Sequence, residues 1–150
     1  METWSVITFL TCAHMAVASF NAKLPELKRP LHQHPTLVRM AEKNNELRQS
    51  YGLAAQKVSP ELTLLAQRHA EWMARTGSFE HNYSHGYPEI IYWNARSIND
   101  AFNGWMNSGP HRGIIMSGNV KVGYGFAISS SGQTYWCGVF GNVADRQDGT

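Results

Sequence analysis

The spacing of apolar side chains predicts two long helices in the first half of the chain. In residues 36–51 apolar side chains recur every three or four positions, and Thr36 is placed to cap the first turn. The same period recurs between Ser59 and Gly77, which have the residue types of an N-cap and of a helix end. Each run has one apolar face, so we expect both helices to pack on a shared core.

The second of these helices carries a histidine and a tryptophan on its apolar face. We expect His69 to be a core histidine with a hydrogen-bond partner, which is commoner on such a face than a metal ligand. If Trp72 is fully buried, Trp72→Ala should lower the free energy of unfolding by about 3–5 kcal/mol. Phe79, which follows the helix, is expected to anchor the next loop in the core.

A third helical run ends at Trp105, where the sequence Asn-Ser-Gly-Pro interrupts it. Glycine and proline do not continue a regular helix, but Pro110 suits the first position of a further short helix. His111 then falls in the first turn of that helix. A histidine held on a rigid element beside a tight turn is well placed to act as a ligand or a base.

The last third of the chain has the pattern of strands. Residues 120–141 alternate between large apolar and small side chains on either side of a Ser- and Gly-containing turn, which predicts a β-hairpin. Residues 89–94 form a short apolar run that begins with the carboxylate of Glu89. Helices followed by strands indicate an α+β fold.

Composition and charge narrow the classes of protein. At 150 residues with 43% hydrophobic residues, the chain is long enough for one domain with its own core. The formal net charge is +2 and the basic residues are scattered, so nothing indicates nucleic-acid binding. Cys12 and Cys137 match neither a disulfide scaffold nor a metal motif, and we interpret them as two free thiols.

The N-terminal segment permits two interpretations. Residues 1–18 contain a short apolar stretch and a small-residue site typical of a signal peptide, but they lack the usual Lys or Arg at the start. Cleaved export and a retained N-terminal anchoring segment therefore both stay open. Residues 19–35 contain three prolines, which predicts an extended lead-in to a domain over 36–141, and 142–150 is a polar tail.

Several blocks of the sequence resemble one protein family, in the family's order. They include the helix that runs into Phe79-Glu80-His81-Asn82, the block at Glu89, the segment Trp-Met-Asn-Ser-Gly-Pro-His-Arg-Gly-Ile-Ile from Trp105, and the closing strands. Over residues 37–141 the chain resembles the CAP superfamily (cysteine-rich secretory proteins, antigen 5, pathogenesis-related 1), in particular its short bacterial-type SCP domains. The resemblance implies a three-layer α-β-α sandwich whose central antiparallel sheet has helices on both faces.

The resemblance also implies that His81 and His111 meet in a central cleft, with Glu89 and Ser108 lining it. In several family members this cleft holds a divalent metal. Two neutral imidazoles and a carboxylate suit zinc with a fourth position left for water, so His81 and His111 are the expected metal ligands and Glu89 could be the third. Glu89 could instead orient a histidine through its second nitrogen. The Gly- and Pro-containing sequence around His85 opposes a helix, so His85 is not expected to form a helical ligand pair with His81.

Three functions are compatible with this resemblance. The leading one is a non-enzymatic binding or effector protein for a protein, lipid or cell-surface ligand, secreted or extracytoplasmic if residues 1–18 are cleaved. The second is a structural component of a larger assembly, such as a cell envelope or a virus particle, with the fold as a scaffold. The third is a metal-dependent hydrolase of peptide or cell-wall substrates, with a water activated near Glu89. No catalytic residue is assigned.

Overall fold

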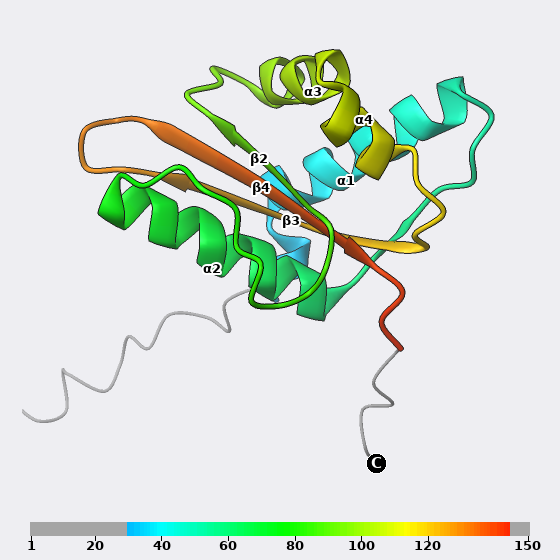
Figure 1. The fold of residues 1–150 in the computed structure, drawn as a ribbon, viewed down its shortest axis with the longest axis horizontal. Helices are drawn as coiled ribbons and strands as arrows, with labels where there is room; N and C mark the ends of the chain where they lie inside the picture. The colour runs from blue at the N-terminus through cyan, green and yellow to red at the C-terminus, as the bar shows by residue number, and fades with distance from the viewer. Residues whose placement is uncertain (1–29, 145–150) are drawn as a thin grey trace, which may run out of the picture.

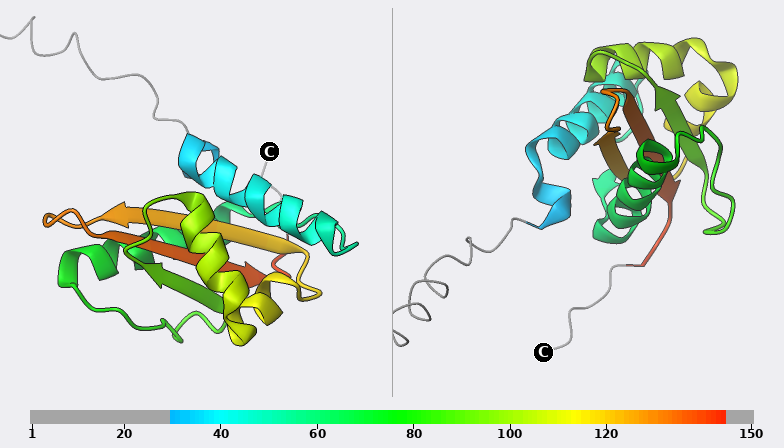
Figure 2. Two further views of the ribbon diagram at one scale, coloured as in Figure 1. Left: turned by 90° about the horizontal axis from the view of Figure 1, so that it is seen from above. Right: turned by 90° about the vertical axis from the view of Figure 1, so that its left-hand side faces the viewer.

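Helices cover both faces of a four-stranded sheet in the computed structural model, which describes residues 30–144 (Figure 1). The strands lie in the order β1–β3–β4–β2. Helix α2 packs on one face, and α1 and α3 lie on the other (Figure 2). The elements are a 3₁₀ helix η1 (Leu31–Gln33), α1 (Pro35–Ser50), β1 (Lys57–Val58), α2 (Pro60–Thr76), β2 (Glu89–Trp93), α3 (Ile98–Asn107), α4 (Gly109–Ile115), β3 (Lys121–Ile128) and β4 (Thr134–Gly141).

The predicted α+β sandwich is confirmed, and the sheet carries one strand that the sequence pattern did not predict. Strand β4 pairs antiparallel with both β3 and β2, and this forms the expected antiparallel core. Strand β1 adds a parallel edge through the pairs Lys57–Lys121 and Val58–Val122. A strand of two residues is too short to show a period of two, so it leaves no signal in the sequence.

The start of the first helix differs from the prediction. Thr36 is not the N-cap, because α1 already begins at Pro35 and its N-cap residue is His34. Proline has a fixed φ and no N–H to satisfy, which favours it at the first helical position. Before it, residues 31–33 form a 3₁₀ turn, so the expected extended lead-in is wrong there. The lead-in up to residue 29 and the segment 1–18 lie outside the described residues.

Arg48, near the end of α1, joins this helix to two other segments of backbone. Its Nε donates to the carbonyl oxygen of Ala54 at 2.8 Å, and its Nη1 donates to those of Ile115 and Ser117 at 2.7 and 2.8 Å. The side chain is buried, and burial lowers the pKa of its guanidinium. Because Ile115 is the last residue of α4, this buried side chain ties the first helix to the short helix that carries His111.

Two glycines allow α2 to lie directly on the sheet. A Cβ at Gly123 would overlap the backbone of Leu62 and Thr63, and one at Gly125 would overlap that of Ala66 and Gln67. Both glycines belong to β3, and the facing residues are in the first half of α2. This close approach sets the distance between helix and sheet, and therefore the position of the α2 side chains that border the cleft.

Aromatic side chains form the core between the sheet and α3. Trp105, Phe102 and Tyr124 are buried, with ring centroids 5.0 to 6.2 Å apart. The Trp105 indole Nε1–H donates to the carbonyl oxygen of Ile91 in β2 at 2.9 Å. This bond fixes α3 against the strand that begins with Glu89.

One expectation about burial is wrong, and the condition stated for Trp72 is not met. Phe79 does not anchor its loop in the core: it is 48% exposed, and its ring lies 6.4 Å from that of Trp93, which is 45% exposed. Trp72 is only partly buried and packs at the margin of the α2 core. An indole is large enough for one edge to pack on a core while another stays at the surface, so period alone did not distinguish the two cases.

Candidate functional site

Glu89 is a buried carboxylate at the first position of β2. Its Oε1 accepts from His81 Nδ1 at 3.0 Å and from the backbone N–H of Asn82 at 2.9 Å, while Oε2 lies 3.2 Å from His85 Nε2. The Glu89 side chain is only 3% exposed. A carboxylate buried to this extent requires such donors. The loop between α2 and β2 supplies all three of them.

The contact with Glu89 selects one tautomer of His81. A carboxylate accepts hydrogen bonds, so the Nδ1 that faces it carries the proton. Nε2 is then the unprotonated nitrogen of the neutral ring and the only one free to bind a metal or accept a hydrogen bond. Glu89 therefore takes the second of the two roles expected for it, that of orienting a histidine.

His111 lies next to His81, as the resemblance implies. It sits in the first turn of α4, half-buried, and the centroids of the two imidazole rings are 6.0 Å apart. Burial, and secondarily the neighbouring His81, lowers the pKa of His111. A lowered pKa keeps the imidazole neutral over a wider pH range, which is the form that binds metals.

Ser108 lies at the junction of α3 and α4. It is half-buried, its hydroxyl makes no capping hydrogen bond, and its carbonyl accepts from the N–H of Arg112 at 2.8 Å. Its position in the chain brings it near His111, but no contact joins its side chain to Glu89 or His81 among the contacts of residues 30–144. Its placement in the cleft stays a prediction.

His85 belongs to the site although the sequence interpretation set it aside. The expected absence of a helical ligand pair was correct, since no helix forms here. Instead a turn brings His85 to Glu89: Gly86 has a φ of +72°, and Gly86 N–H donates to the carbonyl of Tyr83. The His85 side chain is 5% exposed. The neighbouring glycine marks a turn, but nothing in the sequence shows that this turn brings His85 to Glu89.

His69 is a core histidine with a partner, as predicted. Its Nε2 lies 2.8 Å from the carbonyl oxygen of Glu80, and its ring stacks on the Trp72 indole at an interplanar angle of 13° and a centroid distance of 5.5 Å. The same Nε2 is 3.7 Å from Oε1 of Glu89. His69 thus links the surface of α2 to the buried carboxylate.

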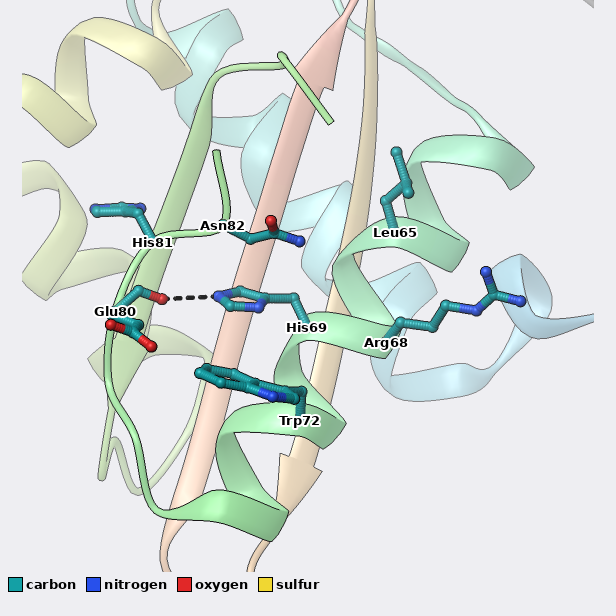
Figure 3. Close-up of a pocket in the computed structure, with 7 residues that line it drawn as sticks. All are labelled: Leu65, Arg68, His69, Trp72, Glu80, His81 and Asn82. Carbon is teal, nitrogen blue, oxygen red and sulfur yellow. Dashed lines mark hydrogen bonds between the residues drawn. The ribbon is translucent and has the colours of Figure 1, made fainter. Parts of the chain in front are cut away.

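A pocket of about 400 Å³ opens between α2 and the loop that follows it (Figure 3). His81 contributes to its wall, so the pocket adjoins the site around Glu89. Its lining residues are Leu65, Arg68, His69, Trp72, Glu80, His81 and Asn82.

Cys137 lies in β4 and is a buried free thiol, as expected. Burial, and then the charge of Glu89 and a hydrogen bond with it, raises the pKa of the Cys137 thiol well above its usual value. A thiol in this state is a poor nucleophile. Cys12, the other predicted free thiol, lies outside the described residues.

His85 is engaged through both ring nitrogens, with Glu89 and with the N–H of Tyr87. The carboxylate of Glu89 is engaged as well, so His81 and His111 are the imidazoles considered for a metal. No group of three or more His, Cys, Asp or Glu side chains within residues 30–144 is arranged to hold a metal ion. His81 and His111 supply nitrogen donors of the kind zinc prefers. Zinc bound by two imidazoles would keep its other positions for water or an external ligand.

The sequence comparison identifies the family. The family model described as the Cysteine-rich secretory protein family (CAP) matches residues 41–140, which is two thirds of the chain. The chain therefore belongs to the CAP family, and the resemblance seen in the sequence is confirmed. His81, Glu89 and His111 all lie within the matched range. No curated protein sequence matches the chain.

Solved structures share this fold at low sequence identity. An outer surface protein from Borrelia burgdorferi has a TM-score of 0.64 at 18% identity, and the match covers 71% of this chain and 92% of that one. Venom allergen-like protein 4 of Schistosoma mansoni has a TM-score of 0.60 at 9% identity, covering 74% and 91%. An extracellular protein containing an SCP domain from Bacillus anthracis has a TM-score of 0.55 at 15% identity, covering 77% and 45%. At these identities the likeness shows the fold.

Proposed function

We propose that this CAP domain is a non-enzymatic binding protein that acts outside the cytoplasm, with a divalent metal such as zinc held in the cleft by His81 and His111. The observation that carries the proposal is the bond between Glu89 and His81, which leaves Nε2 of His81 as the free nitrogen beside a second imidazole. Outer-surface and extracellular proteins among the similar structures support the location. No helix in residues 30–144 could cross a bilayer.

The contacts of Glu89 favour binding over hydrolysis. A general base must reach a water or a substrate proton, whereas both oxygens of Glu89 already accept hydrogen bonds and the side chain is 3% exposed. Cys137 is buried with a raised pKa, and Ser108 has no base in contact with its hydroxyl among the described residues. These features support a cleft that holds a ligand without transforming it.

A zinc titration by calorimetry on metal-stripped protein tests the proposal. We expect one ion to bind the wild type and no binding to the His81→Ala/His111→Ala double variant, because the two rings supply the only protein donors proposed. Glu89→Gln should weaken binding by about 10- to 100-fold, since the amide orients His81 less well than the carboxylate.

The control is the His32→Ala/His34→Ala variant, which also removes two histidines but from the segment around η1. It should bind zinc as the wild type does. Far-ultraviolet circular dichroism should show the two histidine variants folded, because none of the four histidines is fully buried and their side chains contribute little packing. Absence of zinc binding by the wild type would refute the metal and favour the alternative, a structural role in a larger assembly, to be sought by co-purification.

A further inference from the structure

The pocket between α2 and the following loop is largely separate from the proposed metal site. Its volume of about 400 Å³ falls in the range of small-molecule sites. Figure 3 shows side chains from α2 on one side of it and Glu80, His81 and Asn82 on the other. Only His81 is shared with the proposed metal site.

One wall of the pocket is made of parallel rings. The Trp72 indole and the His69 imidazole stack with their planes 13° apart, and Leu65 extends the apolar surface along α2. The stack is rigid, because the carbonyl of Glu80 holds His69 at 2.8 Å. The edges and outer faces of such rings favour an aromatic ligand, which gains edge-to-face or stacking energy beyond the burial of its area.

The same wall offers one hydrogen-bond acceptor. The carbonyl of Glu80 can only accept, so Nε2 of His69 carries the proton, and Nδ1 of the neutral ring is an acceptor. No hydrogen bond within residues 30–144 uses this Nδ1, while every buried side-chain nitrogen or oxygen there has a partner. Nδ1 is therefore reached from the open side of the ring, where the pocket lies. A ligand that satisfies it must donate.

The charges at the margin also favour a donor. Figure 3 shows the carboxylate of Glu80 on the loop side of the pocket, and the guanidinium of Arg68 extending away from the loop. Both residues are exposed. The carboxylate of Glu80 is therefore the charge on the loop side of the pocket, across from the stacked rings, and the aliphatic stem of Arg68 serves as apolar lining.

We propose that this pocket binds an arylalkylamine: a planar aromatic ring joined to a protonated amine by a short chain. The ring packs against Trp72 and Leu65. The ammonium group donates to Nδ1 of His69 or to the carboxylate of Glu80. An aromatic acid of the same shape places a carboxylate against these acceptors and is rejected.

Calorimetric titration of metal-free protein with tryptamine and with indole-3-propionate tests this selectivity, because the two probes share a ring and a chain length and differ in charge. We expect tryptamine to bind in the micromolar to millimolar range and the acid at least about tenfold more weakly. Glu80→Gln should weaken the binding of tryptamine and reduce the difference in affinity between tryptamine and indole-3-propionate. Glu80 is exposed, so this variant should keep the fold.

Two tryptophan variants distinguish binding in the pocket from nonspecific binding to exposed indoles. Trp72→Leu should weaken tryptamine binding by about fivefold or more, while Trp93→Leu, which removes another partly exposed indole, should leave it unchanged. Absence of tryptamine binding by the wild type, equal or tighter binding of the acid, or an equal loss in both tryptophan variants would overturn the proposal. Zinc is absent from these titrations, so failure of the metal proposal does not alter their outcome.

Discussion

At the scale of single residues, Glu89 determines which atoms of the site remain free. Its two oxygens accept from His81, His85 and a backbone N–H, so the carboxylate itself has little capacity left for a ligand. What it provides is orientation: one ring of the cleft is held in a single tautomer. The reactive feature of the site is therefore a pair of imidazole nitrogens, one of them positioned by a buried charge.

The pKa of His111 should respond to His81. It lies below the ordinary value of 6.5 because of burial and, secondarily, the charge of protonated His81. In the His81→Gln variant the second cause disappears, so the pKa of His111 should rise toward 6.5 while staying below it. A pH titration of the histidine ring protons by NMR measures both values. A midpoint above 6.5 in the wild type, or no movement in the variant, would contradict this assignment.

The lowered pKa of His111 also makes the stability of the fold depend on pH in a definite direction. Between the folded and unfolded pKa values of His111, the unfolded chain binds the proton more readily than the folded one. The contribution of His111 to stability is therefore complete above 6.5 and is lost as the pH falls through the folded value.

The sequence could predict the pair His81 and His111 and the carboxylate Glu89 only through the family resemblance. These three residues lie in separate elements, and no periodicity brings them together. His85 could not be predicted, because its contact depends on the turn at Gly86. The exposure of Phe79 could not be predicted either. A large apolar residue in a loop can pack into the core or pair with another ring at the surface, and Phe79 pairs with Trp93.

At the scale of elements, the close contact between α2 and β3 depends on two glycines of β3, Gly123 and Gly125, because neither has a side chain to separate helix and strand. Gly123→Ala should lower the free energy of unfolding by about 3 kcal/mol or more, because the new methyl group would overlap the backbone of Leu62 and Thr63. Backbone atoms cannot rotate away as a side chain could. Urea denaturation followed by circular dichroism provides the measurement.

Gly113→Ala is the matched control, since Gly113 lies in α4 and a Cβ there meets no atom within 4 Å. This variant should be neutral or stabilising by up to about 1 kcal/mol, as alanine favours helix over glycine. Similar losses in both variants would mean that the tight packing of α2 on β3 is not what makes Gly123 necessary.

The helices and the hairpin could be predicted because each has a complete local signal. Ser59 accepts a hydrogen bond from the N–H of Leu62 as an N-cap, and Gly77 ends α2 with a φ of +74°. Where the signal is short or ambiguous, the prediction fails. Strand β1 has two residues, and the sequence around Thr36 offers two starting positions, of which the one that uses Pro35 is adopted.

At the scale of the whole molecule, the site depends on contacts between layers. Trp105→Ala should lower the free energy of unfolding by about 3–5 kcal/mol, because the indole is fully buried and its Nε1–H satisfies the carbonyl of Ile91. The free energy of unfolding of a typical domain is about 5–15 kcal/mol, so this variant should be only marginally stable at room temperature. Thermal unfolding by calorimetry would show it.

Trp72→Ala provides the comparison within the same molecule. Trp72 is only partly buried, so Trp72→Ala should lower the free energy of unfolding by less than Trp105→Ala does, by below about 3 kcal/mol. The larger value that follows from full burial does not apply. If the two variants unfold at the same denaturant concentration, the burial of one of these indoles differs from that described.

The bond from Trp105 to Ile91 has a further consequence for how copies of the chain can meet. On either side of β2, the carbonyl of Pro88 accepts from the N–H of Phe140 and the N–H of Asn94 donates to the carbonyl of Thr134, both in β4. Antiparallel pairing alternates along a strand, so Ile91, which is an odd number of residues from both, directs its N–H and carbonyl to the open edge of the sheet. A free edge of this kind recruits strands from other molecules and seeds aggregation. The indole occupies the acceptor at the middle of that edge, and the opposite edge, β1, is only two residues long. Both edges therefore make poor templates for a further strand.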